Sequence, residues 1–233
     1  MNIIERKQYL NKLIAFKDQQ LIKIITGVRR CGKSTLLEIF QEYLLAQGVE
    51  KEQIIAVNLE DYDYFELRKP DKLYAYIKER LVEGKRSYIF LDEIQHVENF
   101  PDVVDSLFKK KNLDIHLTGS NAYMLFGEIA TLISGRYVEI SMLPLSFKEY
   151  MLSTGDVGNL VSKYNEYLSI SSFPYALELK DTPREYGRTW RWILWLWMKK
   201  GKLTFKWRLQ SGMRSLCKGS SCRCSIYPTI IPS

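Results

Sequence analysis

Short apolar runs alternate with amphipathic segments along most of the chain. The runs are rich in β-branched and aromatic residues, which predicts buried strands; they lie at 21–26, 54–58, 88–91, 115–118 and 137–140. Apolar residues at helical spacing predict helices, which lie at 6–10, 33–47, 70–82, 101–110, 146–151 and 164–170. Strands that alternate with helices form βαβ units. The pattern therefore predicts an α/β fold with a parallel sheet that is covered on both faces.

The turn after the first predicted strand carries the strongest motif. Residues 27–34 read GVRRCGKS and match the pattern GxxxxGK followed by Ser or Thr, between a strand and a helix. Glycine at both ends lets the backbone approach phosphates closely, and the loop N–H groups then point inward at the positive end of the helix. The motif predicts a nucleotide site built from Gly27, Val28, Arg29, Arg30, Cys31, Gly32, Lys33, Ser34 and Thr35.

Several side chains of this loop have expected roles. Lys33 would place a compact cation on the β and γ phosphates, and the Ser34 hydroxyl would bind Mg²⁺. Arg29 and Arg30 fit a nucleotide or a neighbouring subunit as well as they fit a solvated basic loop. Cys31 is expected to be a small neutral filler.

Two acids follow the third predicted strand. Asp92 and Glu93 come directly after the apolar run 88–91, which is the Walker B pattern. Ligands bind at the carboxyl ends of parallel strands, so the acids and the glycine-rich loop are expected at one edge of the sheet. Asp92 is expected to hold Mg²⁺ through water. Glu93 is expected to polarise the water that attacks the γ-phosphate.

Three further residues are candidates for catalysis. Ser120 and Asn121 follow the fourth predicted strand, and either side chain would be able to orient the attacking water. Arg136 precedes the fifth predicted strand, where it would reach a phosphate in its own or an adjacent subunit and stabilise the transition state. An ordinary surface ion pair is the alternative for Arg136. The two histidines are not paired in spacing, so no transition-metal site is predicted.

Charge separates the last 47 residues from the rest. Residues 187–233 carry ten of the 34 Lys and Arg and none of the 27 Asp and Glu, so residues 1–186 have a net charge of −3 while the whole chain has +7. All five tryptophans also lie in this tail. We interpret the tail as a shifted reading frame or a fusion. The alternative is a genuine basic appendage that binds nucleic acid by stacking.

The apolar runs are too short to span a bilayer, and the amino terminus lacks the pattern of a signal peptide. We therefore expect a cytoplasmic protein without a membrane partner.

Five segments together resemble one family, the bacterial and archaeal AAA-type ATPases that carry a poorly characterised second domain. The segments are 27–34, 89–93, 117–121, 134–136 and 143–150. The resemblance implies a P-loop sheet of strand order 5-1-4-3-2, ATP rather than GTP, a sensor at Ser120 or Asn121, and an arginine finger at Arg136.

The resemblance covers about residues 1–186 and implies three regions. They are an ATPase core over 1–145, a partial helical lid or linker over 146–186, and the atypical tail over 187–233. The chain departs from the family at residues 171–174, which read SSFP where the family has Gly-Gly-Phe-Pro. The likeness stops before the family's second domain, so functions housed in that domain are not carried over.

The favoured function is a core that binds Mg-ATP and hydrolyses it. This core would act as a switch or motor on an unknown protein or nucleic-acid partner. Assembly into a homo-oligomer is compatible with this function. The alternatives are a nucleotide-binding module without turnover and a nucleic-acid-associated ATPase. A small-molecule kinase is disfavoured, because residues 120–150 do not read as a lid with several arginines.

Overall fold

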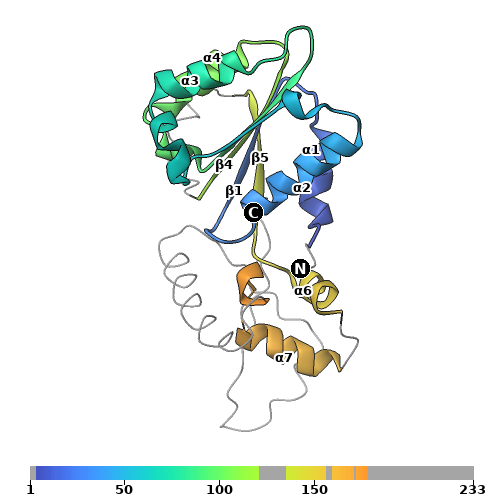
Figure 1. Cartoon of the computed structure of the whole chain (residues 1–233). Coiled ribbons are helices and arrows are strands. Elements are labelled where there is room, and N and C mark those ends of the chain that lie inside the picture. Colours follow the sequence, from blue (N-terminus) through green and yellow to red (C-terminus); the bar gives the residue numbers. More distant parts are fainter. Residues whose placement is uncertain (1–3, 121–134, 156–158, 171, 178–233) are drawn as a thin grey trace.

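A parallel five-stranded sheet of order β2-β3-β4-β1-β5 forms the centre of the computed structural model (Figure 1). The structure describes residues 4–120, 135–155, 159–170 and 172–177. The strands are β1 (Ile22–Gly27), β2 (Ile54–Asn58), β3 (Ser87–Asp92), β4 (Leu113–Gly119) and β5 (Tyr137–Met142). The predicted α/β class and the strand order 5-1-4-3-2 are confirmed.

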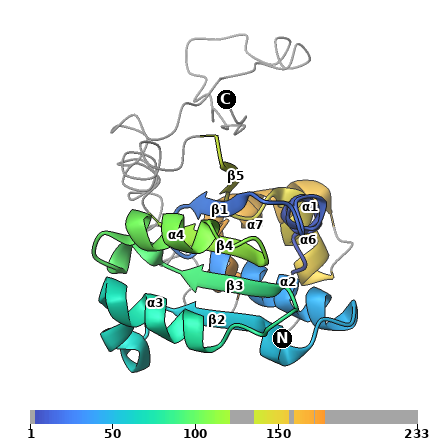
Figure 2. The same ribbon diagram turned by 90° about the horizontal axis from the view of Figure 1, so that it is seen from above.

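Helices cover both faces of the sheet, as the βαβ pattern predicts (Figures 1 and 2). Helices α1 (Lys7–Ala15) and α2 (Lys33–Ala46) lie on one face, and α3 (Pro70–Glu79) and α4 (Phe100–Phe108) lie on the other. Successive side chains of a strand point to opposite faces. Both faces are therefore buried, and every residue of β3 is buried.

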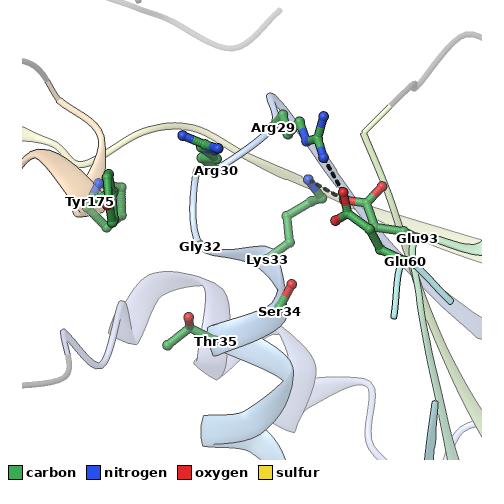
Figure 3. A pocket seen from close by; sticks show the side chains of 10 residues that line it. Arg29, Arg30, Gly32, Lys33, Ser34, Thr35, Glu60, Glu93 and Tyr175 are labelled. Atoms are coloured by element: carbon green, nitrogen blue, oxygen red, sulfur yellow. Dashed lines mark hydrogen bonds and ion pairs between the residues drawn. The ribbon is translucent and has the colours of Figure 1, made fainter. Parts of the chain in front are cut away.

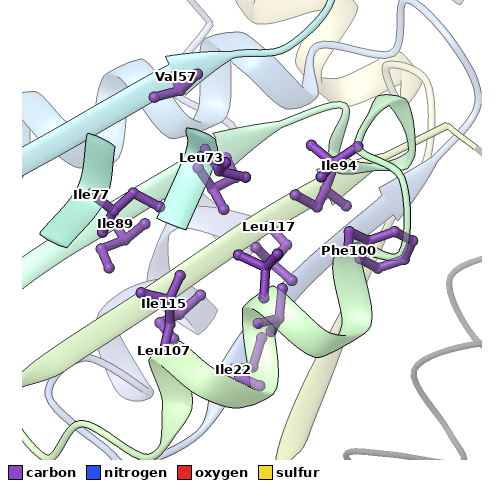
Figure 4. Packing of buried hydrophobic residues seen from close by; sticks show 14 of the residues in the cluster. Ile22, Val57, Leu73, Ile77, Ile89, Ile94, Phe100, Leu107, Ile115 and Leu117 are labelled. Atoms are coloured by element: carbon purple, nitrogen blue, oxygen red, sulfur yellow. The ribbon is translucent and has the colours of Figure 1, made fainter. Parts of the chain in front are cut away.

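The face under α3 and α4 carries the larger apolar cluster (Figure 4). Leu73 and Ile77 of α3 pack with Ile89 of β3, and Leu107 of α4 packs with Ile115 of β4. All five side chains are buried. Each such side chain contributes about 1.5–3 kcal/mol when it leaves water. This cluster makes the sheet a rigid base for the loops at its carboxyl edge.

Sequence signals explain where several helices begin and end. Pro70 occupies the first turn of α3, where its missing N–H costs nothing. That helix ends at Glu79, three residues before the predicted end at 82. Ser146 caps α6 (Phe147–Thr154): its hydroxyl accepts from the Glu149 N–H at 3.3 Å, and the Glu149 carboxylate accepts from the Ser146 N–H at 2.8 Å.

A second layer lies beyond the carboxyl edge of the sheet (Figure 1). It consists of α6, α7 (Leu160–Ile170) and the short 3-10 helix η4 (Pro174–Leu177). Rings of Phe147, Tyr164 and Tyr167 hold α6 against α7, with Phe147 5.0 Å from Tyr164 and 5.6 Å from Tyr167 between centroids. The 3-10 helices of the core are η1 (Lys51–Gln53), η2 (Tyr62–Arg68) and η3 (Ile94–His96).

Within the described part of the chain, no helix combines the length and the apolar character needed to cross a membrane. Asn121 and the basic tail 187–233 lie outside the described residues.

Candidate nucleotide site

The glycine-rich loop links the end of β1 to the start of α2. A Cβ atom at Gly27 would lie 2.3 Å from the carbonyl oxygen of Met142 at the end of β5, so only glycine fits this close approach. Gly32 adopts φ +96, a conformation that side chains other than glycine rarely adopt. The two glycines of the motif are therefore explained by one close contact and one left-handed turn.

Lys33 lies at the first turn of α2 and curls back over the loop. Its side chain is 3% exposed, and its Nζ lies 3.4 Å from the Gly27 carbonyl oxygen and 3.5 Å from that of Val28. The same Nζ donates to Ser120 Oγ at 3.2 Å and lies 3.4 Å from Glu93 Oε1. The ammonium group of Lys33 thus lies at the carboxyl ends of β1, β3 and β4.

Thr118 of β4 organises the two acids that follow β3. Its hydroxyl donates to Asp92 Oδ1 and accepts from the Glu93 N–H at 2.9 Å. Asp92 and Glu93 are both buried. Glu93 adopts a left-handed backbone conformation with φ 51, which is uncommon for this residue type and is typical of functional sites. Sequence reasoning missed Thr118, because a threonine inside a strand also suits β structure.

The Glu93 carboxylate faces the loop with three partners. Ser120 Oγ donates to it at 2.6 Å, Gln95 Nε2 donates to it, and Lys33 forms the ion pair described above. Burial raises the pKa of Glu93, but the charge of Lys33 and the hydrogen bonds from Ser120 and Gln95 outweigh it and hold the pKa below its usual value. The carboxylate is therefore ionised at neutral pH.

A cavity of about 540 Å³ opens over these groups (Figure 3). Its lining residues are Arg29, Arg30, Gly32, Lys33, Ser34, Thr35, Glu60, Glu93, Pro174 and Tyr175. Glu60 and Glu93 lie at one end of the cavity, and Tyr175 lies at the other, with the loop between them. The volume suits a small-molecule ligand. Sequence reasoning missed Glu60 and Tyr175, because neither residue lies in a motif of its own.

The remaining loop residues divide between pocket and core. Arg29 forms an ion pair with Glu60, and the Arg30 guanidinium lies over the Tyr175 ring at 5.9 Å from its centroid. Both arginines line the cavity and both are exposed, so a contact with the nucleotide stays a prediction. Cys31 is fully buried, and burial raises the pKa of its thiol, so it is the neutral filler that we expected. Val28 and Cys31 pack in a second apolar cluster, which includes buried residues of α1 and α2.

Arg136 lies at the opposite edge of the sheet. Its carbonyl oxygen accepts from the Ile22 N–H at 2.9 Å, which places it beside the amino end of β1. The loop starts five residues further along β1 at Gly27, or about 17 Å away at ~3.3 Å per residue, which exceeds the reach of an arginine. Its guanidinium bonds Asp105 at 3.3 Å. The structure therefore does not bring Arg136 to the phosphate loop of its own chain, and its pair with Asp105 is compatible with the surface ion pair that the sequence left as the alternative.

The strand order and the position of the loop define the class of protein. A parallel sheet of order β2-β3-β4-β1-β5, with the GVRRCGKS loop after β1, is the P-loop ATPase fold. The structure is similar to that of the Walker-type ATPase PABY2304 of Pyrococcus abyssi, with a TM-score of 0.57. The sequences are 15% identical, and the likeness covers 86% of this chain and 75% of that chain. At this identity the likeness concerns the fold alone.

The family follows from the sequence. The profile of a family described as an AAA domain matches residues 19–151, and the chain belongs to this family. The resemblance stated above is thereby confirmed, and the chain carries a nucleotide-binding ATPase module.

Two relatives extend the match. An uncharacterized protein of Haemophilus influenzae is 42% identical over 185 residues, which cover 78% of this chain and 46% of that protein. The uncharacterized protein MJ1544 of Methanocaldococcus jannaschii is 31% identical over 193 residues, which cover 78% of this chain and 42% of that protein. The chain spans less than half the length of both relatives.

Proposed function

We propose that this chain binds Mg-ATP in the cavity and hydrolyses it to ADP and phosphate. The observation that carries the proposal is the cluster of Lys33, Glu93 and Ser120, whose polar atoms lie within 3.4 Å of one another at the cavity. A cation for the phosphates and a carboxylate that positions the attacking water recur in phosphoryl transfer, and the Ser120 hydroxyl orients that carboxylate.

Magnesium suits the oxygen donors at this edge of the sheet. The Ser34 hydroxyl lines the cavity, and the Asp92 carboxylate is oriented by Thr118. Hydroxyl and carboxylate oxygens are the hard ligands that Mg²⁺ prefers. We propose that Ser34 binds the ion and that Asp92 holds it through water. A bound ion would neutralise charge on the β and γ phosphates.

The protein groups would act as follows. Lys33 leaves Glu93 and contacts the β and γ phosphates, which frees the carboxylate to accept a hydrogen bond from the attacking water. Ser120 keeps that carboxylate oriented. The ion pair between Lys33 and Glu93 is thus a contact that the nucleotide must replace. We propose that Arg136 acts on a nucleotide bound to an adjacent copy in a homo-oligomer.

We propose that residues 1–145 are the ATPase core and that residues 146–186 form its partial lid. Pro174 and Tyr175 of η4 support this division, because they line the cavity from the second layer. The position of Tyr175, at the cavity end opposite Glu93, suits the nucleoside part of the ligand. The second layer would move when the bound nucleotide changes from ATP to ADP, and this movement would act on the protein or nucleic-acid partner.

Two variants test the proposal. Lys33→Ala should weaken Mg-ATP binding by about 1.5–3 kcal/mol in titration calorimetry, because it removes a charged partner of the phosphates. Glu93→Gln should retain binding but lower the rate of phosphate release by about 10²–10⁴-fold, because it removes the base. Lys72→Ala is the control, since Lys72 is exposed on α3, away from the cavity.

The outcomes separate the candidate functions. Phosphate release that is lost in Glu93→Gln but retained in Lys72→Ala supports the ATPase. Binding that depends on Lys33, without any phosphate release in the parent chain, supports a binding module without turnover. Binding that survives Lys33→Ala overturns the assignment of the phosphate loop.

A further inference from the structure

Arg6 is a buried arginine that the function described so far does not use. It lies just before α1, and only 5% of it is exposed. Its guanidinium donates to the carbonyl oxygen of Cys31 at 3.0 Å and to that of Leu143 at 2.8 Å. A third carbonyl oxygen, that of Pro144, lies at 3.4 Å. One side chain therefore holds the phosphate loop and the segment that leaves β5.

The same guanidinium is fixed from two further sides. Its Nε donates to Glu149 Oε1 at 2.9 Å, and its Cζ lies 4.8 Å from the centroid of the Tyr9 ring. The Tyr9 hydroxyl in turn accepts from the Leu143 N–H at 3.1 Å. Because a guanidinium is planar and carries its donors in a rigid fork, these contacts leave it one orientation.

The contact with Cys31 determines how one peptide of the phosphate loop is turned. In a planar trans peptide, the carbonyl oxygen of one residue and the N–H of the next point in opposite directions. Arg6 holds the Cys31 oxygen, so the Gly32 N–H points away from Arg6. Gly32 lines the cavity, so this N–H is available to a phosphate oxygen there.

The other contacts of Arg6 belong to the second layer. Leu143 and Pro144 connect β5 to α6, and Glu149 is the residue that closes the capping box of α6. The loop peptide and the start of α6 thus share one side chain. A shift of either would change the hydrogen bonds of the other.

We propose that Arg6 is a positioning residue for the nucleotide: it fixes the Cys31–Gly32 peptide in the phosphate-binding orientation and couples that orientation to α6. The inference rests on the proposed function, because it concerns the same cavity. It adds a residue that touches neither the phosphates nor the attacking water. Arg6 acts through the loop backbone, so its effect should appear on any ligand that carries the phosphate chain.

The test compares affinities for Mg-ATP and for inorganic tripolyphosphate by titration calorimetry. Arg6→Lys keeps the charge but loses the fork, and it should weaken both ligands by about tenfold. Leu107→Ala is the matched control, because Leu107 is fully buried in α4 and packs in the apolar cluster under α3 and α4, which contains no residue of the phosphate loop. This control should lower the thermal midpoint but keep both affinities. Equal affinities in Arg6→Lys and the parent chain would overturn the proposal.

A second measurement covers the case in which Arg6→Lys does not fold. Hydrogen exchange of peptides from residues 143–155 is followed in the parent chain and in Glu149→Gln, which keeps the three carbonyl contacts of Arg6. Tripolyphosphate should slow exchange in the parent chain and slow it less in Glu149→Gln. Unchanged exchange in the parent chain despite tripolyphosphate binding would refute the coupling. A parent chain that binds neither ligand would instead refute the proposed function, and the role of Arg6 with it.

Discussion

Replacing Lys23 by methionine should destabilise the fold without touching the candidate site. Lys23 Nζ lies 2.7 Å from Asp114 Oδ1, and neither side chain is exposed. Lys23 also donates to the Gln19 carbonyl oxygen at 2.9 Å, and Asp114 accepts from the Asp18 N–H at 2.7 Å. The pair lies toward the amino ends of β1 and β4, at the edge away from the phosphate loop.

The expected loss follows from the burial of the pair. Methionine fills a similar volume, but it leaves the Asp114 carboxylate buried without its cation. Breaking a buried pair in this way costs about 3–5 kcal/mol. For a chain of this size, one kcal/mol shifts the thermal midpoint by about 2–4 °C, so the midpoint should fall by roughly 6–20 °C.

Urea and thermal unfolding followed by circular dichroism measure this loss. The double variant Lys23→Met, Asp114→Leu should recover most of the stability, because two apolar side chains replace two charges. Lys72→Met, at an exposed position on α3, should stay within about 0.5 kcal/mol of the parent. A loss below about 1 kcal/mol in Lys23→Met, or a double variant less stable than the single one, would refute the reasoning.

Three further predictions concern other groups. Burial lowers the pKa of His116 to about 4. The unfolded chain binds a proton below about pH 6.5 that the folded chain does not, so the free energy of unfolding should fall by about 2 kcal/mol from pH 7 to 5. In urea titrations, His116→Leu should remove this loss. Gly27→Ala should cost about 1–3 kcal/mol more than Gly48→Ala in unfolding, because both glycines have positive φ but only Gly27 meets a backbone oxygen; equal losses would contradict this. Tyr175→Ala should weaken Mg-ATP by about 1 kcal/mol and leave tripolyphosphate unchanged in calorimetry, because the ring would stack on the base; equal losses for both ligands would contradict a nucleoside contact.

The sequence predicts what depends on local patterns. The strands, the helices and the glycine-rich loop each have a periodicity or a spacing of their own, and the strand order followed from the resemblance. The proximity of Lys33 and Glu93 also followed, because both succeed apolar strands of one parallel sheet.

The residues that could not be identified from the sequence form contacts with residues far away along the chain. Arg6 and Lys23 are both buried. The residues next to them in the sequence do not indicate this, because no local sequence pattern distinguishes a buried cation from an exposed one. Thr118 is predictable as a strand residue but not as the partner of Asp92. Tyr175 reaches the cavity only because η4 folds back over the loop, which no local pattern discloses.

The central position of β1 has a consequence for how the chain is made. Ile24 of β1 pairs with Leu117 on one side and with Glu139 on the other, so both partners of this strand leave the ribosome long after it does. Until then the apolar strand has no sheet to join, and pairings this distant in sequence form slowly. The growing chain therefore exposes residues 22–27 until β4 has been made, which makes this segment a natural target for a chaperone.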